Sequence, residues 1–157
     1  MARGCRILAP GSPDRSIQPV DVRDLAAFAL AAAERSIPSA YNVAAPIGRE
    51  TFADLLGACV EVTGSGAVLD WVPDERLVAA GVRQWSEMPL WRTFPGVWQV
   101  DSAAALSAGL SCRLLADTVA DTWSWLQDGS ATALDAERAS EIGISREREQ
   151  QVLASMG

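Results

Sequence analysis

Near the start of the chain, the order of hydrophobic and polar residues is typical first of a strand, then of a helix, then of a second strand. Residues 18–22 form a short extended run, residues 23–34 are an alanine-rich stretch of strong helix formers, and residues 40–44 are a second apolar run. An earlier extended run, residues 5–9, precedes a turn rich in proline and glycine. From this order we predict a parallel pair of strands, 18–22 and 40–44, joined by a crossover helix.

Apolar periodicity predicts further helices in the rest of the chain, with one short strand over residues 67–72. Thr51 and Asp101 are well placed to act as N-caps. Residues 84–100 hold three tryptophans and two prolines, which predicts an irregular loop with a helical turn near residues 86–90. The predicted helices span residues 52–62, 74–80, 102–107, 114–126 and 145–156.

Composition narrows the classes of partner and reaction. The chain has 157 residues, a formal net charge of -7 and 49% hydrophobic residues, which fits one compact domain. Scattered basic residues and the acidic balance argue against a nucleic-acid or membrane partner. All 13 basic residues are arginine, and histidine is absent as well as lysine. Imidazole bases, Ser-His and Cys-His pairs, histidine-ligated metals and Schiff bases are therefore excluded.

Three cysteines, Cys5, Cys59 and Cys112, stand far apart without metal-binding or redox spacing. This pattern predicts three buried, reduced thiols and a cytoplasmic protein. No apolar run has the length of a signal peptide core or of a membrane span. We therefore predict neither secretion nor membrane insertion.

Several segments, taken together and in this order, resemble one protein family. They are residues 6–11 (RILAPG), 18–26 (QPVDVRDLA), 41–43 (YNV), 71–73 (WVP), 88–91 (MPLW) and 100–126. The chain resembles the C-terminal half of an extended short-chain dehydrogenase/reductase, of the NAD-dependent epimerase/dehydratase kind found in actinobacteria. The resemblance covers nearly the whole chain but says little about the substrate.

The resemblance implies an α/β fold that is a truncated Rossmann-like remnant, with few parallel strands, a crossover helix and a small, mainly helical portion of the substrate domain. We expect a single domain over residues 1–157, divided into residual sheet and crossover helix (1–45), substrate-domain-like region (46–130) and helical tail (131–157). The family's N-terminal half carries the glycine-rich phosphate turn and the Tyr-x-x-x-Lys set. Neither has a counterpart here: no lysine accompanies Tyr41, and Ala45 stands where the motif needs it.

A missing N-terminal half has consequences for cofactor and partners. The resemblance implies that this chain alone binds no cofactor, and that NAD(P) enters only if a separate Rossmann half supplies it. The chain is then a naturally shortened homologue, the product of an internal start, or a fragment. An uncovered sheet edge and apolar face predict a homodimer or a companion chain.

Carboxylates are the candidate acid/base groups in a chain without histidine. Asp21 and Asp24 stand where a predicted strand meets a predicted helix. There either Asp24 caps or charges the helix N-terminus while Asp21 and Arg23 form a local ion pair, or Asp21 or Asp24 is a buried acid with a raised pKa. Glu87 and Asp101 lie close in sequence to tryptophans. The candidate catalytic residues are Asp21, Asp24, Glu87 and Asp101.

Aromatic and polar residues suggest a small-molecule pocket. Six tryptophans are many for this length; Trp71, Trp123 and Trp125 are expected to fill core, and the three within residues 84–100 either fill core or line a pocket. Arg15 either clamps an anion or stays a solvated loop charge, and Gln18 is a neutral candidate for orienting a polar ligand. The candidate ligand-binding residues are Arg15, Gln18, Trp85, Trp91, Trp98 and Arg113.

Three functions fit these observations. The leading hypothesis is a dehydrogenase-like protein without autonomous redox activity that binds a small, largely apolar biosynthetic intermediate. A second is a cofactor-independent cyclase, isomerase or dehydratase that uses one carboxylate as acid and base. A third is the substrate-binding half of a split NAD(P)-dependent oxidoreductase.

Overall fold

A computed structural model describes residues 5–36, 39–128 and 142–155. Within these residues the chain is mixed α/β, with six helices, a parallel two-stranded sheet and a short antiparallel pair. In chain order the elements are β1 (Arg6–Pro10), β2 (Ser16–Ile17), α1 (Val22–Glu34), β3 (Glu50–Thr51), α2 (Phe52–Thr63), β4 (Val68–Val72), α3 (Asp74–Ala79), α4 (Ala103–Ser107), α5 (Leu115–Gln127) and α7 (Arg146–Ala154).

The strand pairing differs from the prediction. β1 pairs in parallel with β4, in a register that sets Leu8 beside Asp70, while β2 pairs antiparallel with β3. Residues 18–20 and 40–44 are extended but join no sheet. The parallel pair is therefore built from the other two predicted strands, with α2 in the crossover between them.

Gln18 and Pro19 explain why the predicted strand over residues 18–22 is wrong. Pro19 has no N–H to offer a ladder. The Gln18 side chain is buried, and its amide donates to the carbonyl oxygens of Ala45 and Val100 at 2.8 and 2.9 Å. A side-chain amide thus holds residue 45 where strand pairing was expected, and Val22 already belongs to α1.

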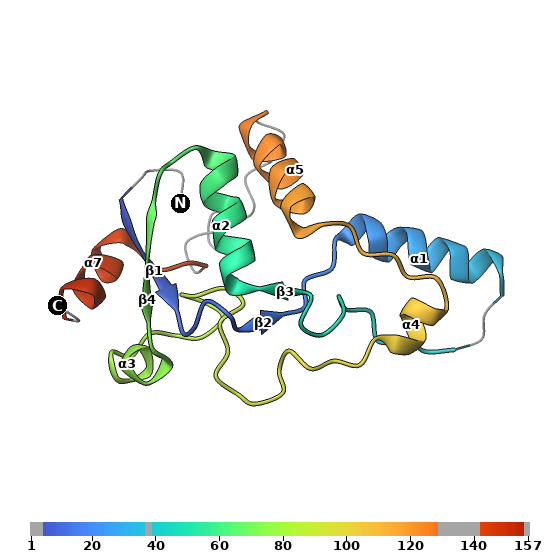
Figure 1. Cartoon of the computed structure of the whole chain (residues 1–157), viewed down its shortest axis with the longest axis horizontal. Helices are drawn as coiled ribbons and strands as arrows, with labels where there is room; N and C mark the ends of the chain where they lie inside the picture. The colour runs from blue at the N-terminus through green and yellow to red at the C-terminus, as the bar shows by residue number, and fades with distance from the viewer. Residues whose placement is uncertain (1–4, 37–38, 129–141, 156–157) are drawn as a thin grey trace.

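Two hydrophobic clusters hold the elements together. The larger one joins β1, β4, α2, α3 and the loop that follows α3, with Trp91, Phe52, Ile17 and Leu77 almost fully buried. The smaller one joins α1 to α4 through Phe28, Ala105 and Leu110. Figure 1 shows β1, β4, α3 and α7 at one end of an elongated molecule, and α1 with α4 at the other.

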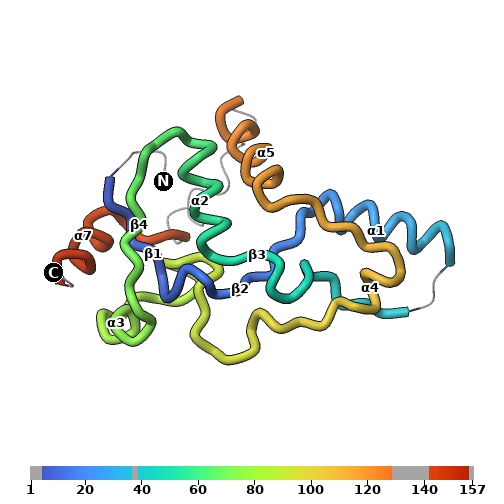
Figure 2. The backbone as a smooth tube through the Cα atoms, viewed as in Figure 1, coloured from blue at the N-terminus to red at the C-terminus, as the bar shows by residue number. Residues whose placement is uncertain are grey.

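The segment between α3 and α4 connects these two ends. The tube in Figure 2 shows it running from α3 along the lower side of the molecule to α4, past β2. It contains no helix, and turns dominate it, as predicted. One short bridge, Gln84 to Met88, stands in place of the helical turn expected near residues 86–90.

Helix α2 shows how strongly local signals fix an element. The Thr51 hydroxyl accepts from the Asp54 N–H at 3.2 Å, and the Asp54 carboxylate accepts from the Thr51 N–H at 2.8 Å, which together form a capping box. Gly64 ends the helix in a left-handed conformation, with φ of 58°. The predicted helix over residues 52–62 is confirmed.

We expect Thr51→Ala to lower the free energy of unfolding by about 1 kcal/mol, the usual cost of losing an N-cap side chain. Urea unfolding followed by circular dichroism measures this loss. Thr51→Ser, which keeps the hydroxyl, serves as the control and should retain most of the stability. An equal loss in both variants would show that the hydroxyl does not stabilise the helix.

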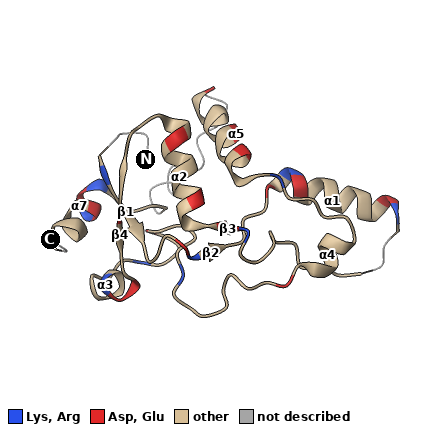
Figure 3. Ribbon diagram, viewed as in Figure 1, with Lys and Arg blue, Asp and Glu red and all other residues tan. Residues whose placement is uncertain are grey.

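Charge is distributed as the composition indicated. Figure 3 shows the arginines scattered over the molecule, and α2 and α5 carry acidic but no basic residues. None of the helices within the described residues has the length and apolar character needed to cross a bilayer.

Candidate functional site

The first candidate group, at the N-terminus of α1, is a network of paired charges. Asp21 is the N-cap of α1 and accepts from the Arg23 N–H at 2.8 Å and from its guanidinium at 2.7 and 2.9 Å. The Thr118 hydroxyl of α5 donates to the same carboxylate at 2.8 Å. Asp24 accepts from the backbone and guanidinium of Arg113 at 2.7 to 2.9 Å. The network ties α1 to α5 and to the segment before it.

These contacts set the pKa values of both carboxyl groups. Hydrogen bonds from Arg23 hold the pKa of Asp21 far below its usual range, in spite of burial. Hydrogen bonds from the Arg113 side chain and backbone likewise lower the pKa of Asp24. The expectation of a buried acid with a raised pKa is therefore wrong for both residues. The expected Asp21–Arg23 ion pair is confirmed, as is Asp24 as a charge in the first turn of the helix, whereas the N-cap is Asp21 and not Asp24.

The other two candidate carboxylates bond local backbone. Glu87 accepts from the Arg83 N–H at 2.6 Å, and Asp101 accepts from the Ala103 N–H at 2.9 Å at the start of α4. Neither lines the cavity described below. The four candidate catalytic residues are therefore not brought together in one site.

Three candidate ligand-binding residues have structural partners instead. Trp91 is 0% exposed in the larger cluster, and its indole N–H donates to Asp74 at 2.9 Å. Both polar atoms of the Gln18 amide bond backbone groups, because Oε1 also accepts from the Val100 N–H at 2.8 Å. Arg113 is held by Asp24. Each of the three therefore has a structural partner, and its ligand role stays a prediction.

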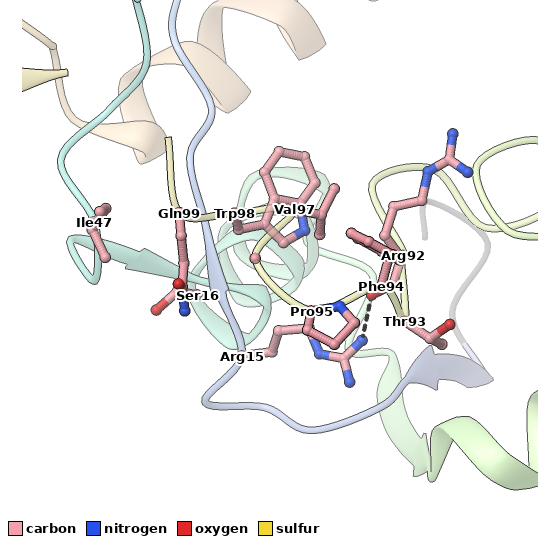
Figure 4. Close-up of a pocket in the computed structure, with 11 residues that line it drawn as sticks. Arg15, Ser16, Ile47, Arg92, Thr93, Phe94, Pro95, Val97, Trp98 and Gln99 are labelled. Atoms are coloured by element: carbon pink, nitrogen blue, oxygen red, sulfur yellow. Dashed lines mark hydrogen bonds between the residues drawn. The ribbon is translucent and has the colours of Figure 1, made fainter. Parts of the chain in front are cut away.

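Two of the remaining candidates, Arg15 and Trp98, line one cavity of about 340 Å³, and the third, Trp85, lies outside its wall. Arg15 and Ser16 line it from the start of β2, Ile47 from the turn before β3, and residues 92–99 from the loop between α3 and α4. Figure 4 shows the Trp98 indole above Arg15 and Pro95, with Gln99 to one side. The tryptophan-rich loop therefore forms most of the wall of a cavity large enough for a small molecule.

Trp98 is the central aromatic residue of this cavity. Its indole nitrogen is buried and finds no hydrogen-bond acceptor among the described residues. Trp85, which is 49% exposed, stacks on Trp98 with ring centroids 6.5 Å apart and planes inclined by 28°. A buried donor without an acceptor is unfavourable. Because this nitrogen has almost no accessible surface, a ligand in the cavity would supply the acceptor only if the side chains that cover the nitrogen move.

Two arginines line the cavity, and both have partners within the protein. The Arg15 guanidinium pairs with Asp74 and donates to the Arg92 carbonyl oxygen at 3.0 Å, the dashed line in Figure 4. The Arg92 guanidinium lies 5.0 Å from the Trp85 ring and points away from the other lining residues. Gln99, by contrast, has a side-chain amide without a hydrogen bond to any described residue. Polar groups therefore make up more than half of the exposed lining of the cavity, beside apolar side chains.

Sequence reasoning missed several residues of the wall. Phe94, Pro95 and Val97 lie within the tryptophan-rich loop over residues 84–100 and line the cavity. Their side chains have no polar groups, so the sequence did not indicate a binding role for them. Ile47 follows a proline in a turn, and only the tertiary fold brings it to residues 92–99. Phe94 is 76% exposed, which leaves one side of the cavity open to solvent.

The cysteines do not contribute a reactive site. Cys5 is exposed, which corrects the expectation of burial, whereas Cys59 and Cys112 are half-buried and all three are free. Burial raises the pKa of the Cys59 and Cys112 thiols, which keeps them protonated. Across residues 5–36, 39–128 and 142–155, no three acidic or cysteine side chains are placed to hold a metal ion together.

Of the trio expected to fill core, Trp71 and Trp123 are half-buried and Trp125 is 45% exposed. The expectation is therefore wrong for Trp125, which lies on the outer side of α5.

Comparison of the chain with family models, with curated proteins and with solved structures gives no match.

Proposed function

We propose that this protein binds a small, neutral and largely apolar molecule in the cavity beside Trp98, without redox chemistry of its own. The observation that carries the proposal is the buried Trp98 N–H without an acceptor, in the wall of a 340 Å³ cavity. The bound molecule would lie with its apolar part against Phe94, Pro95 and Val97, and a carbonyl or ether oxygen of it would reach the Trp98 N–H once the side chains that cover this nitrogen shift. The free Gln99 amide offers a second polar contact.

The proposal includes the family relationship. We infer that the described chain corresponds to the C-terminal, substrate-binding half of a member of the dehydrogenase/epimerase group; residues 1–157 contain neither the glycine-rich turn nor the Tyr-x-x-x-Lys set. Support comes from the order of the resembling segments and from the parallel β1–β4 pair with α2 in its crossover. The ligand is then a biosynthetic intermediate, and the cytoplasm remains the predicted location.

A thermal-shift screen tests ligand binding directly. The probes are neutral aromatic and aliphatic ketones, each paired with a carboxylic acid of the same carbon skeleton. We expect some ketones to raise the melting temperature, since a ligand that binds only the folded state stabilises it by about 2.7 kcal/mol at a hundredfold excess over Kd. Because both nearby arginines are engaged, the paired acids should bind no more tightly. A screen in which no neutral compound shifts the melting temperature contradicts the proposal.

The acid/base alternative has less support from the geometry. Asp21 and Asp24 are fixed in ion pairs with lowered pKa values, and Glu87 and Asp101 bond backbone away from the cavity wall. A cyclase or dehydratase needs a carboxyl group that faces its substrate. We therefore favour binding over catalysis.

One observation favours the split-oxidoreductase alternative. A groove of about 540 Å³ lies between α2 and α5 and is lined mainly by apolar side chains, among them Leu55, Val119, Trp123 and Leu126. A companion half carrying NAD(P) would cover such a surface. In that case NADH fluorescence would change only when both halves are mixed, and the present chain alone would leave it unchanged.

A further inference from the structure

One charged pair supports the wall of the cavity beside Trp98. Arg15 lines this cavity, and its guanidinium pairs with Asp74, the first residue of α3. A second contact joins Arg15 Nη1 to the Arg92 carbonyl oxygen, at 3.0 Å. These contacts use two of the five N–H groups of a guanidinium, and the other three form no hydrogen bond with any described residue. Arg15 therefore keeps donors for a ligand although its charge is balanced.

Asp74 is itself held at both of its carboxylate oxygens. Oδ2 accepts from Arg15, and Oδ1 accepts from the indole N–H of Trp91 at 2.9 Å. Since Trp91 is 0% exposed, the second contact anchors the carboxylate to the larger hydrophobic cluster. Asp74 does not belong to the cavity wall. Its effect on a ligand is therefore indirect, through the charge and the position of Arg15.

The backbone leaves room for this pair. Gly11, which follows β1, has a φ of 73°, and a Cβ at this residue would lie 2.7 Å from Asp74 Oδ1 and 3.0 Å from Arg15 Nη2. A side chain at residue 11 would be strained and would also displace the pair. The Arg15 and Asp74 side chains are 24% and 21% exposed. The pair is therefore part of the packed fold beneath the cavity.

We propose that Asp74 determines the charge preference of the cavity: it balances Arg15, so that the wall accepts a neutral oxygen of a ligand and disfavours a carboxylate. The inference rests on the proposed function for the place of the ligand, and deepens it by assigning a residue to specificity. A ligand carboxylate bonded to Arg15 would also lie close to Asp74, and like charges repel. Arg92 does not offset this repulsion, because its guanidinium lies over Trp85 and points away from the other lining residues.

Replacing Asp74 tests the preference with two probes of nearly the same shape and different charge, acetophenone and benzoate. Two-dimensional NMR of the isotope-labelled chain, followed at the backbone amides within residues 92–99, measures both dissociation constants and locates the probes. In the wild type we expect benzoate to bind no more tightly than acetophenone. Asp74→Asn removes the charge and keeps an oxygen for the Trp91 N–H. It should bind benzoate about tenfold more tightly and change acetophenone binding by less than about twofold.

Asp70→Asn is the matched control. Asp70 is also paired with an arginine, Arg6, and 20% of its side chain is exposed, against 21% for Asp74. This variant has the same net charge as Asp74→Asn, but neither Asp70 nor Arg6 lines the cavity. Its affinities for both probes should equal those of the wild type. Asp74→Asn combined with Arg15→Gln removes the attracting cation and should abolish the gain for benzoate.

Arg15→Gln alone tests the preference in the opposite direction, also if Asp74→Asn does not fold. Asp74 then has no cation beside the cavity, so the ratio of the benzoate to the acetophenone dissociation constant should rise about tenfold. Damage to the fold alone would weaken the binding of both probes and leave this ratio unchanged. The amide spectrum shows whether each variant is folded.

The ratio of the two dissociation constants decides the outcome. A folded Asp74→Asn or Arg15→Gln chain with the wild-type ratio overturns the proposal, as does an equal gain for benzoate in Asp70→Asn. If acetophenone still binds in these cases, the proposed function stands without this specificity. Benzoate binding confined to Asp74→Asn, with no acetophenone binding to any chain, supports the role of Asp74 and counts against binding of neutral ketones. If neither probe binds any of the chains, the proposal is overturned.

Discussion

Replacing Trp91 with alanine is expected to lower the free energy of unfolding by about 4 kcal/mol, the range found when a large buried aromatic side chain is removed. Trp91 is 0% exposed and packs in the cluster that joins β1, β4, α2 and α3. The substitution also leaves Asp74 without the indole N–H that it accepts at 2.9 Å. Urea unfolding followed by far-ultraviolet circular dichroism measures the loss.

Trp125→Ala is the matched control. Trp125 lies on α5 and is 45% exposed, so its removal should cost less than about 1 kcal/mol. Equal destabilisation by the two variants would contradict the assignment of Trp91 to the core. If Trp91→Ala left the stability unchanged and weakened ligand binding, Trp91 would belong to the binding site, as the sequence analysis predicted.

Asp21→Asn is expected to lower the free energy of unfolding by about 2 kcal/mol at neutral pH, the usual worth of hydrogen bonds to a charged group, because its partner Arg23 is 45% exposed and keeps Asp121 as a second partner. The Asp21 side chain is 3% exposed and bonds Arg23 and Thr118. Asparagine can still act as the N-cap of α1, so the loss of stability measures the effect of the Asp21 charge and not the loss of the cap. Asp117→Asn, at an exposed position in the first turn of α5, is the control and should change stability little.

The effect of Asp21 depends on pH in a defined direction. Its pKa is lower in the folded chain than in the unfolded chain, so ionised Asp21 contributes its full stability above pH ~4, the unfolded value. The contribution declines as the pH falls from there toward the folded pKa. The stability difference between wild type and Asp21→Asn should therefore be constant from neutral pH to about pH 5 and shrink in more acidic solution. A difference that grows on acidification would contradict the ion-pair assignment.

Local signals explain which elements were predictable from the sequence. Helix α2 has a capping box at Thr51 and a glycine at its C-terminus, and α7 begins at Ser145, whose hydroxyl accepts from the Arg148 N–H at 3.2 Å. These contacts lie within a few residues of each other, so the pattern alone reveals them. The strands over residues 5–9 and 67–72 were recognisable from their short extended runs, which are also local in sequence.

Pairing of the strands depended on contacts that the pattern does not contain. The sequence order favoured residues 18–22 with 40–44 as partners, because neighbouring elements usually pack together. The structure instead joins β1 to β4 across more than fifty residues. The Gln18 amide, which bonds backbone at residues 45 and 100, takes the place of the expected ladder.

The candidate site was predictable only in part, and burial decided the outcome. The tryptophan-rich loop does line a cavity with Trp98 and Arg15, but Trp91 in the same loop fills core. Tryptophans a few residues apart on irregular backbone can face opposite ways, and no period tells them apart. Likewise Asp21 and Asp24 resemble acid/base groups in sequence, but hydrogen bonds from Arg23 and from the distant Thr118 and Arg113 lower their pKa values.

A fluorescence titration with the best ketone from the screen tests the central claim most directly. Trp98→Phe keeps an aromatic wall but removes the indole N–H, while Trp125→Phe removes an indole outside the cavity. We expect saturable binding of one molecule per chain, weakened about tenfold by Trp98→Phe, the value of one buried hydrogen bond, and unaffected by Trp125→Phe. Equal affinity of the wild type and Trp98→Phe for every ketone that binds would contradict a ligand site at Trp98.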